Sequence, residues 1–110
     1  MKTTIATHTQ TTPSIELIDT TLTISGNAIT IEPELFWALP LHQIKQHKNI
    51  DSVIVELNYV SSSSLPHIIN LIKNIPGAAV TWICQHHDDD MIELGESLEY
   101  VVTNEFSIKY

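Results

Sequence analysis

The chain has 110 residues, of which 43% are apolar, so it is long enough for one domain with one modest hydrophobic core. Its 5 basic residues are all lysines, and they face 13 acidic residues, for a formal net charge of −8. Nucleic acids and anionic membranes attract basic surfaces, so this charge argues against both as partners. The start lacks an apolar signal core and no window resembles a membrane span, so we expect a cytoplasmic protein.

Residues 1–13 are rich in threonine and lack apolar periodicity. We therefore expect a flexible N-terminal arm over residues 1–13 and one folded domain over residues 14–110. Polar and apolar residues alternate over much of residues 15–31, which predicts two or three short antiparallel strands. Gly26-Asn27 is a typical turn pair and predicts a turn between two of these strands.

Glu32-Pro33-Glu34 has the proline and the acidic residues that are typical of a helix start. Apolar residues then recur at helical spacing, which predicts a helix to about Lys48. These residues are Leu35, Phe36, Leu39 and Ile44. Pro40 lies inside this helix and removes one backbone hydrogen bond, so we expect it to kink the helix or divide it.

Residues 51–57 are apolar at most positions, which predicts a central strand buried on both faces of a sheet. An apolar helix pattern follows over residues 65–75 and stops at Pro76-Gly77. Residues 78–84 predict the next strand, which should be parallel to the central one because a helix connects the two. Cys84, at the end of this strand, is expected to be a buried core residue and not a reactive thiol.

Asp88-Asp89-Asp90 should lie at the start of a third helix, whose dipole favours carboxylates there. Its buried stripe should contain Met91, Leu94 and Leu98, and Gly95 between them indicates close packing. Residues 106–110 alternate as a last strand. The predicted order β-β-α-β-α-β-α-β indicates an α/β domain with one mixed sheet of four or five strands and helices mostly on one face. Trp37 and Trp82 are expected to be core anchors.

Four consecutive serines, Ser61–Ser64, lie where the central strand passes into the second helix. The first amides of a helix lack intrahelical acceptors, so a hydroxyl or a phosphate at this position should find hydrogen-bond donors. This position suits a phosphoacceptor. Serine is also a preferred N-cap residue, so the same pattern is explained by helix capping alone.

Several short motifs occur in order along residues 9–110. They are Thr9-Gln-Thr-Thr-Pro-Ser-Ile15, Ile24-Ser-Gly26, Tyr59-Val-Ser-Ser-Ser-Ser64, Trp82, and Asp89-Asp-Met-Ile-Glu-Leu-Gly-Glu96. Together they resemble the SiaC family of bacterial regulatory phosphoproteins, whose fold is like that of STAS-type anti-sigma-factor antagonists.

This resemblance implies a protein without catalysis or cofactor of its own. It implies phosphorylation on the serine run by a dedicated Ser/Thr kinase with a histidine-kinase-like ATPase fold, and dephosphorylation by a metal-dependent phosphatase. The unphosphorylated form would bind and activate a diguanylate cyclase, in cyclic di-GMP signalling that controls biofilm formation or aggregation. By position the acceptor is Ser61, with Ser62 and Ser63 as alternatives. The family usually has asparagine and lysine where this chain has Val60 and Leu65.

A switch site controls binding only if it lies at or beside the interface, so we expect the partner surface to include the serine run and the acidic side of the third helix. The expected residues are Val60, Ser61, Ser62, Ser63, Ser64, Leu65, His67, Asp89, Asp90, Glu93 and Glu96. An acidic ridge would steer a basic target, although the same acids also suit a solvated helix face.

Other functions remain open at this point. Val60 and Leu65 would also fit a constitutive protein-binding module that has lost phosphorylation, or an anti-sigma-factor-antagonist-like switch with a different partner. His86, His87 and the aspartates after them carry groups that bind zinc or manganese, but adjacent residues rarely converge on one ion. A serine hydrolase using His67 would need an oxyanion loop or a nucleophile elbow, and the sequence has neither.

Overall fold

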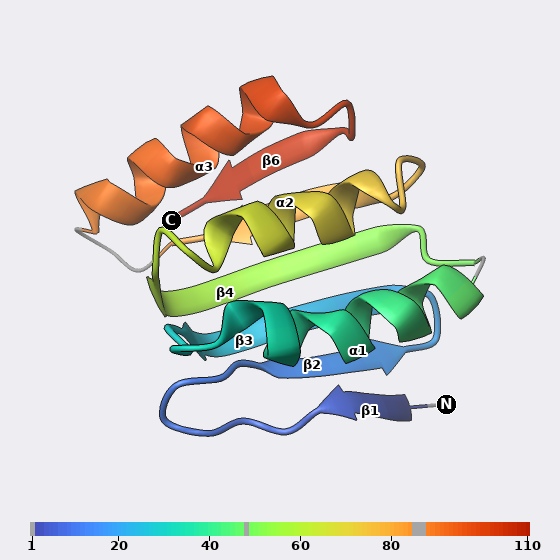
Figure 1. Ribbon diagram of the computed structural model, residues 1–110. Helices are drawn as coiled ribbons and strands as arrows, with labels where there is room; N and C mark the ends of the chain where they lie inside the picture. Colours follow the sequence, from blue (N-terminus) through green and yellow to red (C-terminus); the bar gives the residue numbers. More distant parts are fainter. Residues whose placement is uncertain (1, 48, 85–87) are drawn as a thin grey trace.

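The structure is a computed structural model that describes residues 2–47, 49–84 and 88–110 (Figure 1). Within these ranges the chain forms a six-stranded sheet and three helices. In chain order the elements are β1 (Lys2–Ala6), β2 (Ser14–Ile18), β3 (Thr21–Ala28), α1 (Pro33–Gln46), β4 (Ser52–Val60), α2 (Leu65–Lys73), β5 (Ala79–Ile83), α3 (Asp89–Val101) and β6 (Phe106–Lys109). None of these helices combines the length and apolarity that crossing a bilayer requires.

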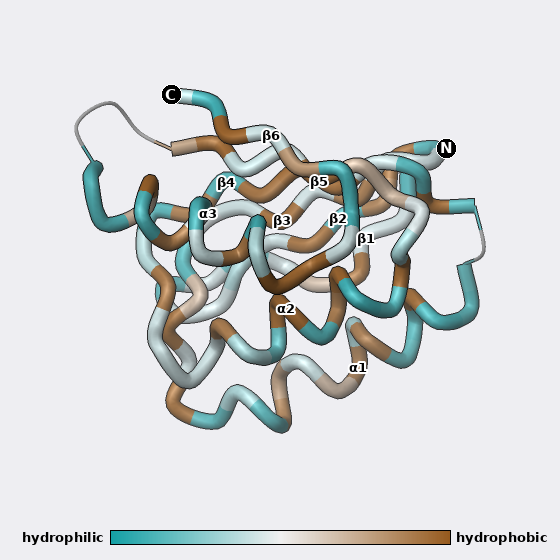
Figure 2. The backbone as a smooth tube through the Cα atoms, turned by 90° about the horizontal axis from the view of Figure 1, so that it is seen from above, coloured by the Kyte–Doolittle hydropathy of each residue, from teal (hydrophilic) through white to brown (hydrophobic). Residues whose placement is uncertain are grey.

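The strands follow one another across the sheet in the order β1-β2-β3-β4-β5-β6. The pairs β1/β2 and β2/β3 are antiparallel, whereas β3/β4, β4/β5 and β5/β6 are parallel. Each parallel pair is joined by one helix, and right-handed crossovers that advance in one direction place their helices on the same face. Figures 1 and 2 show α1 and α2 together on one face of the sheet. The prediction of a mixed α/β sheet is confirmed, with six strands instead of four or five.

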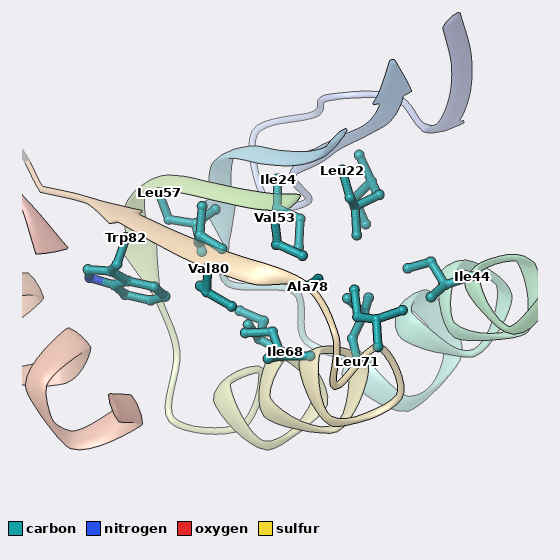
Figure 3. Packing of buried hydrophobic residues seen from close by; sticks show 14 of the residues in the cluster. Leu22, Ile24, Ile44, Val53, Leu57, Ile68, Leu71, Ala78, Val80 and Trp82 are labelled. Atoms are coloured by element: carbon teal, nitrogen blue, oxygen red, sulfur yellow. The ribbon is translucent and has the colours of Figure 1, made fainter. Parts of the chain in front are cut away.

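The core lies between the helices and this face of the sheet (Figure 3). Strand residues such as Val53 and Val80 meet Ile68 and Leu71 of α2 and Ile44 of α1. In the described part of the chain the opposite face carries no helix, so burial alternates along the strands. The prediction that the central strand is buried on both faces is therefore wrong. In β4 the buried residues Val53, Val55 and Leu57 alternate with half-buried Ile54 and exposed Glu56.

The prediction of a flexible arm over residues 1–13 is wrong for Lys2–Ala6, which form β1 at the edge of the sheet. Ile5 is buried in the core, and Lys2 Nζ lies 3.0 Å from Glu16 Oε2 on β2. An edge strand obtains its hydrogen bonds from its neighbour and can be stable with one buried residue. Threonine also favours extended backbone, so the lack of apolar periodicity in residues 2–6 did not exclude a strand.

The turn predicted at Gly26-Asn27 is also wrong, because β3 runs through both residues. The pairing of β3 with β4 shifts register at this point, and Gly26 has φ of +106°. A Cβ on Gly26 would lie 3.0 Å from Nδ1 of His8, which disfavours a larger residue at this position. Gly26 therefore lies at a β-bulge in the pairing with β4 and not in a turn. The hairpin between β2 and β3 instead turns at Asp19-Thr20, where Asp19 has φ of 54°.

Of the two outcomes predicted for Pro40, a kink or a division of the helix, the division is wrong, because α1 is a single helix. Pro40 belongs to the buried face of α1, together with Pro33, Trp37 and Ile44. Burial of this face stabilises the helix despite the lost hydrogen bond. Leu35 and Leu39, which supported the sequence prediction of the helix, are instead 73% and 56% exposed.

Helix α3 packs on Trp82 of β5 through Gly95. A Cβ at Gly95 would come within 2.6 Å of the Trp82 ring, and Nε1 of Trp82 donates to the Met91 carbonyl at 2.9 Å. The predicted close packing at Gly95 and the core positions of Trp37 and Trp82 are thus confirmed.

The buried Asn104 was not predicted from the sequence. Its Nδ2 donates to the carbonyls of Ile75 and Ala78 at 2.9 and 2.8 Å, which fixes the turn before β5.

Candidate functional site

The serine run forms the turn between β4 and α2. It lies at the end of the sheet where the parallel strands have their carboxyl ends, and we call this end the carboxyl edge. Helices α1, α2 and α3 all begin at this edge, on the left in Figure 1. Loops at the carboxyl ends of parallel strands can vary without disturbing the sheet, which is why sites in such folds gather there. The location therefore agrees with a functional role for the serine run.

Ser61 holds this turn together through its backbone and its side chain. Its amide donates to the Ala28 carbonyl of β3 at 2.9 Å, and its carbonyl accepts from the amides of Ser64 and Leu65, each at 3.1 Å. Its hydroxyl accepts from the Ser64 amide at 3.2 Å and lies 3.1 Å from the hydroxyl of Ser63. The Ser61 hydroxyl is thus held in a fixed direction.

The four serines differ in exposure. Ser62 and Ser63 are exposed, Ser61 is half-buried, and Ser64 is fully buried. Ser64 occupies the N-cap position of α2, yet its side chain makes no capping hydrogen bond and its Oγ has no partner among the described residues. The side-chain contact expected of a cap comes from Ser61 instead. Ser62 and Ser63 are thus open to solvent and Ser61 is partly so, whereas Ser64 is not.

The start of α2 does not offer a phosphate the free amides that we expected. The amides of Ser64 and Leu65 already donate to Ser61, and Pro66 has no N–H. The amides of His67 and Ile68 both donate to the Ser64 carbonyl. The expectation of waiting donors is therefore wrong, because the serine turn closes hydrogen bonds that a simpler helix start leaves open.

The structure brings the end of β4 together with the acidic side of α3. Val60, Asp90 and Glu93 line one surface hollow of about 330 Å³, with Met91, Leu94 and Ser97 of α3. Asp89 and Glu96 are exposed on the same helix but do not line the hollow. Since Val60 precedes Ser61 directly, the hollow adjoins the serine turn.

Leu65 and His67 lie on the other flank of the turn. Leu65 is half-buried against the core. His67 Nε2 approaches Glu34 Oε1 of α1 at 4.0 Å. Glu34 and the start of α1 also belong to this edge, which was not predicted from the sequence. Acidic residues in the first turn of α1 were visible in the sequence, but their distance from the serines became clear only with the sheet order.

The first turns of α1 and α3 are acidic, whereas the last turns of α1 and α2 carry a lysine. Glu34 lies in the first turn of α1, and Asp89 and Asp90 lie in the first turn of α3. Lys45 and Lys73 lie in the last turns of α1 and α2, at the opposite edge. Acidic residues at helix starts and basic residues at helix ends both match the helix dipole. The consequence here is an acidic edge around the serine turn.

Cys84 lies near this edge and is buried, as predicted. Desolvation by burial raises the pKa of its thiol, and the negative charge of Asp88 raises that pKa further. The thiolate is therefore disfavoured, and the residue serves as a small core side chain.

The two enzymatic alternatives gain no support. His86 and His87, on which the metal hypothesis depends, lie outside the described residues. Among the residues that are described, no group of three or more His, Cys, Asp or Glu side chains could hold a metal ion. In the same part of the chain, the Ser61 hydroxyl contacts Ser63 and Ser64, whereas His67 approaches Glu34, so the serine-histidine pair of a hydrolase is not formed.

Known proteins resemble this chain in sequence profile and in fold. The sequence profile described as "SiaC family regulatory phosphoprotein" matches residues 6–110. No curated protein sequence matches the chain. Among solved structures, apo-SiaC from Pseudomonas aeruginosa is similar with a TM-score of 0.80 and 16% identity, covering 100% of this chain and 99% of that one. A second structure of P. aeruginosa SiaC has a TM-score of 0.82 and 14% identity, covering 99% and 98%.

The chain is also similar, with a TM-score of 0.80 and 16% identity, to a chain in the complex of the P. aeruginosa diguanylate cyclase SiaD with its activator SiaC. The match covers 93% of this chain and 94% of that one. At these identities the structures establish a common fold, and the sequence profile supplies the family. The chain therefore belongs to the SiaC family of regulatory phosphoproteins.

Proposed function

We propose that this protein is a non-catalytic switch in the cytoplasm whose unphosphorylated form binds and activates a diguanylate cyclase. A dedicated Ser/Thr kinase with a histidine-kinase-like ATPase fold phosphorylates Ser61, and a metal-dependent phosphatase reverses the reaction. Family membership supports a regulatory phosphoprotein. The complex of SiaD with its activator SiaC supports a cyclase as the kind of target.

The observation that carries the proposal is the serine turn itself, which presents an accessible hydroxyl beside an acidic hollow. Ser61 is held in place by β3 and by its own turn. The hollow that begins at Val60 continues onto Asp90 and Glu93 of α3. A phosphate on Ser61 would therefore stand between two candidate contact surfaces, the start of α2 and the acidic side of α3.

The charge of the phosphate accounts for the direction of the switch. Phosphorylation adds a charge of about −1.5 to −2 at neutral pH, and it orders a segment chiefly by pairing with arginine. This chain has no arginine, and the first amides of α2 are already bonded. The phosphate thus finds no arginine in this chain and no free amide in the first turn of α2, and it repels or obstructs the partner instead.

The proposal is tested by intact-mass measurement of the protein from its native host, with and without treatment by a generic phosphatase. We expect a species heavier by one phosphate that disappears on treatment. Ser61→Ala should abolish this species, whereas Ser64→Ala, at the buried serine, should retain it. Loss of the phosphate in Ser62→Ala or Ser63→Ala instead would move the acceptor within the exposed part of the turn.

A second experiment identifies the target. Unphosphorylated Ser61→Ala protein, used as bait in a lysate of the native host, should capture a diguanylate cyclase, and the purified cyclase should make cyclic di-GMP faster in its presence. If no phosphate is found while a target is still captured, the protein is a constitutive binding module. If the captured target is an anti-sigma factor, the switch serves a different pathway.

A further inference from the structure

The start of α1 exposes an apolar strip that no element of the described chain covers. Ile31, Leu35 and Leu39 are 93%, 73% and 56% exposed, and Ile29 is 38% exposed. Monomeric proteins seldom leave several large apolar side chains exposed in one contiguous patch, and such a patch usually marks an interface. We call Ile29, Ile31, Leu35 and Leu39 the α1 strip.

The α1 strip borders a shallow hollow that the N-terminal loop helps to form. Thr11, Thr12, Thr30, Glu32 and Phe36 line this hollow of about 530 Å³ together with Ile31 and Leu35. Leu35 and Leu39 are one helical turn apart, so they form a ridge of the kind that fits between the side chains of another helix. An amphipathic helix that docks on another protein inserts apolar residues spaced by three or four, and this ridge beside a hollow offers such residues apolar surface to pack against.

Charge on the rim of the strip decides what kind of helix fits. Glu32 and Glu34 are exposed beside the apolar residues. The lysines of α1 and α2, Lys45 and Lys73, lie in the last turns of these helices, away from the strip. An apolar surface with carboxylates at its rim is complementary to a helix that carries lysine or arginine beside its apolar face.

The α1 strip is continuous with the serine turn. The Ser61 amide donates to the carbonyl of Ala28, and the next residue, Ile29, begins the strip. On the helix side, Glu34 of α1 approaches His67 of α2 at 4.0 Å. A ligand seated on the strip would therefore lie beside Ser61, on the flank opposite to α3.

We propose that the α1 strip is the apolar anchor of the partner-binding surface and that it receives a basic amphipathic helix of the target. This inference rests on the proposed function, since it names the surface by which the regulated partner is held. Phosphate on Ser61 then acts at the border of the anchor, where it crowds the docked helix. The acidic side of α3 provides charge rather than apolar contact.

The test uses a helical peptide of about 18 residues, five turns, made of leucine and lysine with the leucines on one face. A scrambled peptide of the same composition is the control for charge. Binding to the full-length protein is measured by isothermal calorimetry and by amide chemical shifts. We expect the amphipathic peptide to bind at least about tenfold more tightly than the scrambled one and to shift the amides of residues 29–39.

The protein variants are matched in the same way. Leu35→Gln with Leu39→Gln changes exposed side chains without changing charge, and should weaken peptide binding by about tenfold or more. Tyr100→Gln with Val101→Gln alters another exposed apolar pair, on α3, and should leave binding unchanged. Glu32→Gln with Glu34→Gln should weaken binding and flatten its dependence on salt.

The proposal is overturned if both peptides bind equally, or if the leucine variant binds the amphipathic peptide as the parent does. Self-association of the parent that is lost in the leucine variant would also overturn it, because the occupant would then be a second copy of this chain. These results leave the phosphorylation of Ser61 and the capture of a cyclase untouched, so the inference can fail while the proposed function stands.

Discussion

At the scale of single residues, the four serines have different roles although they are identical in chemistry. Ser61 closes the turn, Ser62 and Ser63 face solvent, and Ser64 buries a hydroxyl that has no partner. An unpaired buried hydroxyl costs free energy, because it has left its water ligands without replacement.

This difference predicts opposite effects on stability for two alanine substitutions. Ser64→Ala should leave the free energy of unfolding unchanged or raise it by up to about 1 kcal/mol, because it removes an unsatisfied group. Ser61→Ala should lower it by about 0.5–1.5 kcal/mol, because the hydrogen bond from the Ser64 amide is lost. Urea denaturation of the unphosphorylated proteins measures both, and a more stable Ser61→Ala than Ser64→Ala would contradict this account of the turn.

Gly95 supplies a second prediction at this scale. Its missing side chain makes room for the Trp82 ring, which a Cβ would approach to 2.6 Å. Gly95→Ala should therefore lower the free energy of unfolding by about 1–3 kcal/mol, despite the better helix propensity of alanine. Gly77→Ala is the matched control, since a Cβ there meets nothing within 4 Å. It should be neutral or stabilising by up to about 1 kcal/mol; equal destabilisation by both substitutions would rule out the packing explanation.

At the scale of elements, α1 and α3 present different chemistry on the two sides of the serine turn. Helix α1 offers exposed leucines, whereas α3 offers exposed carboxylates. Apolar contacts contribute mainly to the lifetime of a complex, and charges contribute mainly to the rate at which it forms.

Reversing charge on α3 should therefore act on association. Glu93→Lys with Glu96→Lys should lower the association rate with the captured cyclase and reduce its dependence on salt. Glu99→Lys with Glu105→Lys makes the same change of charge near the far end of α3 and is the control. Stopped-flow measurements across a series of salt concentrations compare the two. Equal effects would mean that net charge matters and the position on α3 does not.

At the scale of the whole molecule, the sheet brings the starts of three helices to one acidic edge while the rest of the domain serves as support. Because phosphate finds no arginine and no free amide at the start of α2, phosphorylation should change the surface and not the fold. Amide spectra of the free and phosphorylated protein should differ mainly around residues 59–68. Shifts spread through β2 and β5 would show instead that the domain rearranges.

Much of this arrangement was predictable from local patterns. The helices over residues 65–73 and 89–101 and the parallel strands β4 and β5 carry strong apolar periodicity, the start of α1 was marked by its proline and acidic residues, and Gly95 indicated close packing. Strand β1 was missed because pairing with β2, not its own sequence, gives it order. Gly26 suits a turn and a bulge equally well, and only the pairing with β4 distinguishes the two.

The candidate site was predictable in part. The serine junction and the outward acids of α3 followed from the sequence, because each depends on one element and its ends. The proximity of Val60 to Asp90, and of His67 to Glu34, depends on the order of strands in the sheet. The exposure of Leu35 and Leu39 was hidden because Trp37 and Pro40 fill the core side of α1 instead.

The most direct test of the central claim is the affinity of the captured cyclase for two Ser61 variants that circular dichroism shows to be folded. Ser61→Ala should bind as tightly as the unphosphorylated parent. Ser61→Asp, which places a negative charge at the turn, should bind at least about tenfold more weakly and fail to activate the cyclase. If Ser61→Asp binds and activates as the parent does, the serine turn is a helix cap and not a switch.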